Sequence, residues 1–193
     1  MISAIILAAG ESKRMGQPKM LLPWGKTTVL GHVIATFQKA GIQDIVVVVG
    51  GARAQVEEIL KQSAARAIFN EQYAKGGMLV SLQRGLEAQL QPTQAALIAL
   101  GDQPQIQERT VDLISEAFES STSRLILPSF RLRRGHPWLV ERSLWREVLE
   151  IPPERSPRDF LNAHADEIQY VQVDNASILA DLDTMEEYRK ARP

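Results

Sequence analysis

Six short apolar segments, each of the length of a β-strand, recur along the chain. They lie at residues 4–7, 44–49, 67–69, 95–100, 124–127 and 168–173. Most of them, such as the runs IVVVV and ALIAL, are continuously apolar rather than alternating, which is typical of strands that are covered on both faces. The pattern therefore predicts a mostly parallel sheet with helices packed against each side.

Amphipathic helical patterns separate these strands. The segment 27–40 begins with a threonine suited to capping, ends at Gly41, and carries one apolar stripe made of Val29, Leu30, Val33, Ile34 and Phe37. Segments 78–90 and 110–120 repeat the pattern after the third and fourth strands. The alternation predicts a doubly wound, Rossmann-like α/β fold, in which the loops after Leu7, Phe69 and Leu100 share the ligand-binding edge of the sheet.

Two sequence patterns in the second half of the chain predict the N-termini of further helices. Ser156 is followed by a proline at the first helical position and by Asp159, and Thr184 is followed by Glu187. Both patterns match a capping box, in which the two side chains satisfy each other's backbone amides. We expect a helix after each of them.

Composition narrows the class of protein. A chain of 193 residues with no linker or repeat predicts a single domain spanning 1–193. The formal net charge is -1, so no global field favours nucleic acid or a membrane surface as a partner. The absence of cysteine excludes a disulfide framework. The first apolar stretch lacks a basic leader and is too short for a signal or a span, so we expect a cytoplasmic protein.

The loop after the first strand, LAAGESKRMGQPK at residues 7–19, is rich in small and basic residues. It is either a solvated turn or a cradle for an anion. The dinucleotide fingerprint fails because no glycine stands at the second and third required positions after Gly10. The segment Gly25-Lys26-Thr27 resembles the end of a phosphate loop, but Met20 stands where the first glycine of that loop is required.

The remaining pattern suits a triphosphate. Ala8, Ala9 and Gly10 allow backbone amides to approach a ligand closely. Arg14 has a planar fork that matches phosphate oxygens, and Lys19 supplies a compact charge. Asp102, at the end of the run ALIAL, would face the same edge of the sheet, where one or two carboxylates suffice for Mg²⁺.

The same segment resembles the signature of nucleotidyltransferases, most of all the molybdenum cofactor cytidylyltransferase group within the MobA-like NTP transferases. The segments KMLLPWGKTTVLGHV, GGMLVSLQRGL, ALGDQPQI, RRGHPWLV and DLDTMEEY continue the resemblance along nearly the full chain. It implies transfer of a nucleoside monophosphate, with CTP as the first choice of donor, to the phosphate of a molybdopterin-type acceptor, with release of pyrophosphate. Adenylyl or guanylyl transfer to a related acceptor, and a non-catalytic molybdopterin-binding maturation factor, remain open alternatives. A molybdoenzyme that receives the product is a further candidate partner.

The resemblance also implies roles for individual residues. It assigns catalysis to Arg14, Lys19 and Asp102, and Mg²⁺ binding to Asp102 and Asp183, with Asp181 as the alternative to Asp183. Acceptor binding falls to His136 and Arg134, with Arg155 and Arg158 as weaker candidates. Ser81 is either a contact to the nucleobase or an ordinary helix residue. The nucleotide-binding set as a whole is Leu7, Ala8, Ala9, Gly10, Arg14, Lys19, Gly76, Gly77, Ser81 and Asp102.

Overall fold

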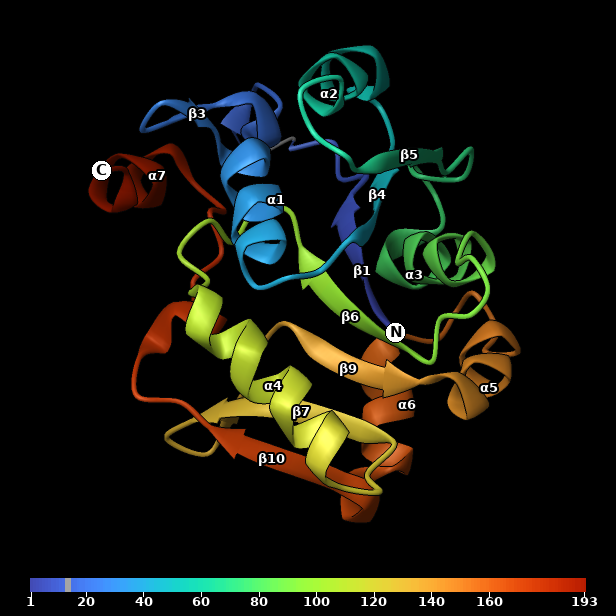
Figure 1. Cartoon of the computed structure of the whole chain (residues 1–193). Helices are drawn as coiled ribbons and strands as arrows, with labels where there is room; N and C mark the ends of the chain where they lie inside the picture. The colour runs from blue at the N-terminus through green and yellow to red at the C-terminus, as the bar shows by residue number, and fades with distance from the viewer. Residues whose placement is uncertain (13–14) are drawn as a thin grey trace.

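An eight-stranded sheet runs through the middle of the molecule (Figure 1). The computed structural model describes residues 1–12 and 15–193. The strand order is β10, β7, β9, β6, β1, β4, β5, with β8 paired to β7. The strands are β1 (Ile2–Ala8), β4 (Asp44–Val49), β5 (Arg66–Phe69), β6 (Ala95–Leu100), β7 (Leu125–Phe130), β8 (Arg133–Arg134), β9 (Trp138–Glu141) and β10 (Ile168–Gln172).

Most neighbouring strands are parallel. In the centre of the sheet, Leu7 of β1 is in register with Val48 of β4 on one side and with Leu100 of β6 on the other. Phe69 of β5 is in parallel register with Val49 of β4, so the carboxyl ends of β1, β4, β5 and β6 meet at one edge, and the loops after Leu7, Phe69 and Leu100 share it as predicted. The exceptions are β9, which pairs antiparallel with both β6 and β7, and the short β8, which pairs antiparallel with β7.

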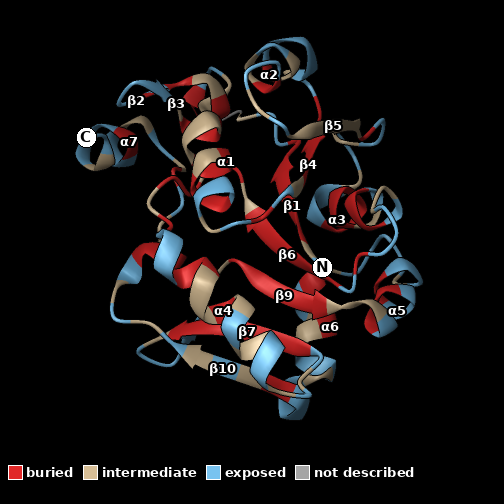
Figure 2. Cartoon of the chain, viewed as in Figure 1, coloured by how far each residue is buried: buried red, intermediate tan, exposed pale blue. Residues whose placement is uncertain are grey.

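Helices cover both faces of the sheet, and the strands between them are buried (Figure 2). One face is covered by α1 (Val29–Lys39), α2 (Arg53–Leu60) and α4 (Glu108–Ser120), and the other by α3 (Gly77–Glu87), α5 (Trp145–Leu149) and α6 (Pro157–Ala163). Side chains of β1 alternate between the two cores, with Ile6 in the first and Ile5 in the second. The doubly wound, mostly parallel α/β fold is thus confirmed.

The end of the described chain returns to its beginning. After β10 the chain forms η5 (Ala176–Leu179) and α7 (Met185–Ala191), and α7 lies beside the hairpin of β2 (Pro23–Trp24) and β3 (Thr27–Thr28). Tyr188 is buried there, and its hydroxyl donates a hydrogen bond of 2.6 Å to the Pro23 carbonyl. We call residues 176–191 the C-terminal strap, because they hold the segment around Asp183 against the first loop.

Several sequence predictions are confirmed in detail. The strands at 44–49 and 95–100 have the predicted bounds, and Ser156 and Thr184 both form capping boxes, with Asp159 and Glu187 respectively. The helix predicted from residue 27 begins at Val29 because Thr27 and Thr28 pair with β2 and Thr28 caps the helix. Strand β9 and helices α2 and α5 were not predicted. No helix within the described residues is long and apolar enough to cross a membrane.

Candidate active site

Two glycines set the path of the first loop as it leaves β1. The Gly101 amide donates a hydrogen bond of 3.0 Å to the Leu7 carbonyl, and a Cβ on Gly50 would overlap with the Ala9 carbonyl oxygen. Gly10, the next residue, has open space where a side chain would point. The loop is therefore closely packed up to Ala9 and open from Gly10 onward. Sequence reasoning missed both glycines, although Gly50 directly follows the last residue of β4 and Gly101 directly follows the last residue of β6.

Lys19 is the centre of the polar cluster at this edge of the sheet. It opens the short helix η2 (Lys19–Leu21), and its backbone amide donates to Ser12 Oγ at 3.1 Å. Its Nζ contacts Asp102 Oδ2 and lies 3.4 Å from Asp183 Oδ1. The fold thus brings together three residues that the sequence assigned to one site. Arg14 lies outside the described residues.

The side chains of Lys19 and Asp102 are largely shielded from water, with exposed fractions of 13% and 14%, whereas that of Asp183 is 48% exposed. Burial alone would lower the pKa of Lys19, but the ion pair with Asp102, and then that with Asp183, outweighs burial and raises the pKa. Lys19 is therefore a fixed positive charge at neutral pH.

The carboxylates of Asp102 and Asp183 fit a divalent cation. They come from separate segments and converge on one positive charge, the Lys19 ammonium. The Leu182 amide donates to the Asp102 carbonyl at 3.2 Å, which aligns the two segments. Across the residues that the structure describes, no group of three or more histidine, cysteine, aspartate or glutamate side chains is arranged to hold a metal ion. Two carboxylates suit Mg²⁺, which completes its shell with water and substrate phosphates.

Gln103 and Asp181 form a second polar pair beside this cluster. Gln103 is buried, and its Nε2 donates a hydrogen bond to Asp181 Oδ1. Burial raises the pKa of Asp181; the hydrogen bond from Gln103 opposes this rise, and the charges of Asp102 and Asp183 add to it. Both residues of the pair line a large pocket, whereas Asp102 and Asp183 contact Lys19. The sequence signal for Gln103 was its place in the GDQP segment, where only the aspartate was singled out.

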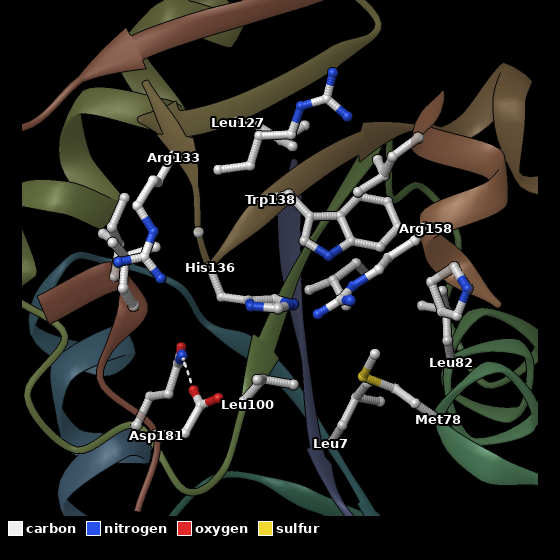
Figure 3. Close-up of a pocket in the computed structure, with 18 of the residues that line it drawn as sticks. Leu7, Met78, Leu82, Leu100, Leu127, Arg133, His136, Trp138, Arg158 and Asp181 are labelled. Carbon is white, nitrogen blue, oxygen red and sulfur yellow. Dashed lines mark hydrogen bonds between the residues drawn. The ribbon is translucent and has the colours of Figure 1, made fainter. Parts of the chain in front are cut away.

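That pocket has a volume of about 540 Å³ and lies between the carboxyl ends of β1 and β6, helix α6 and η5 (Figure 3). Much of its wall is apolar and includes Leu7, Leu82, Leu100, Leu127 and Trp138. Its volume lies within the range of sites for small organic ligands, which are mostly apolar with a few polar groups. Of the predicted acceptor residues, both His136 and Arg134 line it.

His136 is held in the wall of the pocket by the strap. Its backbone amide donates to the Ile178 carbonyl at 3.1 Å, and a Cβ on the preceding Gly135 would overlap with that same carbonyl oxygen. Burial, with a smaller contribution from the charge of Arg158, lowers the pKa of His136 to about 4. The imidazole is therefore neutral at physiological pH.

Three arginines of residues 15–193 also line the pocket. Arg134 is held in place: its Nε donates to the Tyr170 hydroxyl at 2.7 Å, its Nη1 donates to Asn162 Oδ1 at 3.2 Å, and its guanidinium lies 5.6 Å from the centre of the Tyr170 ring. Arg133 and Arg158 reach the pocket from β8 and α6. Arg155, the other candidate on this segment, is not among the residues that line it.

Helix α3, which follows β5, carries the predicted nucleotide-binding residues Gly77 and Ser81. Gly77 has a φ of 60°, a backbone conformation that favours glycine, and it begins α3 directly after Gly76. Ser81 is only 5% exposed, and its Oγ accepts a hydrogen bond of 3.0 Å from Asn70 Nδ2. Of the two interpretations of Ser81, its position favours the structural one, in which it anchors the loop after β5.

Comparison with known proteins identifies the family. Residues 4–168 match the MobA-like NTP transferase domain. The chain belongs to this family. The matched region contains Lys19 and Asp102, but Asp181, Asp183 and the C-terminal strap lie beyond its end.

Similar proteins extend over almost the whole chain. The molybdenum cofactor cytidylyltransferase of Escherichia coli (strain K12) is 31% identical over 99% of this chain and 95% of its own length. The nicotine blue oxidoreductase of Paenarthrobacter nicotinovorans is 28% identical over 96% of this chain and 94% of its own. The crystal structure of Rv0371c from Mycobacterium tuberculosis H37Rv has a TM-score of 0.83 and 26% identity, covering 98% of this chain and 96% of that one, and a manganese complex of the same protein has a TM-score of 0.80 and 24% identity.

Proposed function

We propose that this member of the MobA-like nucleotidyltransferases transfers CMP from CTP to the phosphate of a molybdopterin-type acceptor and releases pyrophosphate. The observation that carries the proposal is the convergence of Lys19, Asp102 and Asp183 beside the loop after β1. The full-length relative from Escherichia coli named as a molybdenum cofactor cytidylyltransferase supports the choice of CTP and of this acceptor.

The reaction requires positioning and charge neutralisation rather than a strong base. A phosphate monoester has a second pKa of about 6, so it is largely a dianion at neutral pH and attacks the α-phosphorus directly. Lys19, which keeps its proton because of the two carboxylates beside it, would hold triphosphate oxygens and offset the charge that develops on the leaving pyrophosphate. The open space at Gly10 would admit the phosphates next to the backbone of the loop.

Asp102 and Asp183 are the residues that would hold Mg²⁺. When bound, this ion supplies charge neutralisation and orientation of the phosphate oxygens. The carboxylate of Asp102 is the better shielded of the two and contacts Lys19, and the backbone carbonyl of Asp102 accepts the hydrogen bond from the Leu182 amide; the carboxylate of Asp183 is more exposed. The manganese complex of the structural relative Rv0371c is consistent with a divalent ion in this fold.

The apolar pocket would receive the ring system of the acceptor. It is lined by Gln103, which follows Asp102 in the chain, and by Asp181, which is two residues before Asp183, so a ligand in the pocket would have its near end on the side of the Lys19 cluster. The neutral His136 and the fixed Arg134 provide polar contacts farther along the wall. Enclosure of this kind holds the nucleophile close to the α-phosphorus.

Pyrophosphate release tests the function. The purified chain is incubated with Mg²⁺, molybdopterin and either CTP, GTP or ATP. We expect pyrophosphate release with CTP, and only when the acceptor is present. A preference for ATP or GTP would change the assigned nucleobase but would leave the assignment as a nucleotidyltransferase intact. No release with any triphosphate, combined with retained molybdopterin binding, would support a non-catalytic maturation factor.

Two variants test the roles of the central residues. We expect Lys19→Ala and Asp102→Ala each to lose at least about 99% of pyrophosphate release, because one oriented charge in such a site contributes roughly a hundredfold or more. Lys26→Ala is the matched control, because Lys26 is an exposed lysine near the same loop. Circular dichroism establishes that the variants are folded. Turnover at the wild-type level in either site variant would refute the assignment.

One relative of nearly full length is named as an oxidoreductase, so a second class of activity is assayed in the same preparations. The first loop lacks the glycine fingerprint of dinucleotide-binding folds, which favours nucleotidyl transfer. Consumption of a reduced nicotinamide cofactor without pyrophosphate release would reverse that preference.

A further inference from the structure

The large pocket carries more positive charge than the proposed reaction uses. Among the residues that the structure describes, three guanidinium groups line it, those of Arg133, Arg134 and Arg158, against one carboxylate, that of Asp181. His136 adds no charge at neutral pH, since its pKa is about 4. The chain as a whole has a formal net charge of -1, so this excess is local.

The three arginines are available to a ligand. Arg134 is oriented by neutral groups, the Tyr170 hydroxyl and the Asn162 side chain, so its charge is not offset. Within the described part of the chain, neither Arg133 nor Arg158 forms an ion pair with a carboxylate. A guanidinium that is oriented or unpaired at the edge of an apolar pocket is suited to a planar oxyanion, which it binds through two parallel hydrogen bonds.

The arginines come from elements that do not carry the proposed metal-binding aspartates, Arg133 and Arg134 from β8 and Arg158 from α6. Figure 3 shows Asp181 near Leu100 in the lower part of the view, and Arg133 and Arg158 above it on either side of His136. Gln103 follows Asp102, and its partner Asp181 is two residues before Asp183, so on the proposed function the phosphate that reacts lies on their side of the pocket. The arginines can therefore bind a part of the acceptor other than the phosphate that reacts.

We propose that the pocket binds an acceptor with a second anionic group on its ring system, and that Arg133, Arg134 and Arg158 hold this group. The inference rests on the proposed function, because it assumes that the reacting phosphate lies at the Lys19 cluster. It identifies the substrate class as a ring compound that is anionic at both ends. The apolar wall, which includes Trp138, holds the ring between the two charged ends.

Binding of two fluorescent pterins tests the anion site without any turnover. Pterin and 6-carboxypterin share the ring and differ in one carboxylate, and neither has a phosphate. Fluorescence titration gives both affinities for the wild-type chain and for Arg158→Gln. Arg155→Gln is the matched control, because Arg155 is an exposed arginine three residues earlier that does not line the pocket.

We expect the wild-type chain to bind 6-carboxypterin about tenfold more tightly than pterin, the scale of one charge-assisted hydrogen-bonded pair at a partly exposed site. This preference should fall to less than about threefold in Arg158→Gln and at high salt, and persist in Arg155→Gln. The affinity for pterin should not change. Equal affinities for the two ligands in the wild-type chain, no binding of either, or equal behaviour of the two arginine variants would each overturn the proposal.

The outcome is separable from that of the proposed function. A carboxylate preference that depends on Arg158, in a chain that releases no pyrophosphate with any triphosphate, keeps the anion site and rejects the transferase assignment. Turnover with CTP in a chain that does not distinguish the two pterins keeps the transferase assignment and rejects the anion site.

Discussion

His136 makes the stability of the protein depend on pH in a calculable way. Lowering its pKa from 6.5 to about 4 corresponds to about 3 kcal/mol of differential proton binding between the folded and unfolded chains. Well above pH 6.5 the imidazole is neutral in both states, so its titration does not change the free energy of unfolding. As pH falls from 6.5 to 4, the unfolded chain binds a proton that the folded chain does not, so the free energy of unfolding decreases, and below pH 4 this loss is complete.

The perturbation is His136→Gln, which replaces the imidazole by a polar group that does not titrate. Between pH 7 and pH 5 the histidine accounts for a loss of about 2 kcal/mol, so the variant should lose about 2 kcal/mol less than the wild-type chain over this interval. Urea unfolding followed by tryptophan fluorescence at both pH values gives the two differences.

His164→Gln is the control with the opposite sign. Burial alone would lower the pKa of His164, but its hydrogen bonds and ion pairs with Glu147 and Glu167 outweigh burial and raise the pKa. Its contribution to stability is complete below pH 6.5 and is lost as pH rises through the raised pKa, so its removal should steepen the decline between pH 7 and pH 5. An unchanged decline in His136→Gln would refute the assignment of a neutral, partly buried imidazole in the pocket wall.

Three further outcomes are expected. Asp183→Asn should raise the Mg²⁺ concentration that gives half-maximal pyrophosphate release by about tenfold, as the loss of one charged ligand implies; an unchanged titration would move the metal-binding role to another carboxylate. Gly135→Ala should lower the free energy of unfolding by about 2 kcal/mol or more, because the new Cβ overlaps with the Ile178 carbonyl, whereas Gly10→Ala, with open space, should change it by less than about 0.5 kcal/mol in the same urea titration. Tyr188→Phe should cost about 1 kcal/mol in thermal or urea unfolding, the contribution of one hydrogen bond, and no change would mean that the strap is held by apolar contacts alone.

The parts of the fold that sequence reasoning identified are those with local causes. The continuous apolar runs of β4 and β6 and the capping boxes at Ser156 and Thr184 are each decided by neighbouring residues, and each is found where it was predicted. Strand β9 was missed because four residues carry little periodic signal, and its antiparallel place between β6 and β7 depends on pairing with distant segments.

The candidate site shows the same division. The first loop and the GDQP segment are recognisable from their residues, but the pairing of Gln103 with Asp181 arises from two segments that are 78 residues apart. The burial of Ser81 against Asn70 likewise depends on how α3 packs, which no local pattern states. Many candidate site residues can be predicted from the sequence, but tertiary contacts decide which of them face a ligand.

The C-terminal strap gives the order in which the site becomes complete during synthesis. All strands of the main sheet end by Gln172, so a chain that stops shortly after this residue contains the whole sheet, Lys19 and Asp102. It lacks Asp183, whose contact with Lys19 spans 164 residues of sequence. A chain that is still being translated, or one cleaved by a protease before the strap, would therefore have a nearly complete fold but only one aspartate of the proposed metal-binding pair. On that proposal, tight metal binding would distinguish intact molecules from shortened ones.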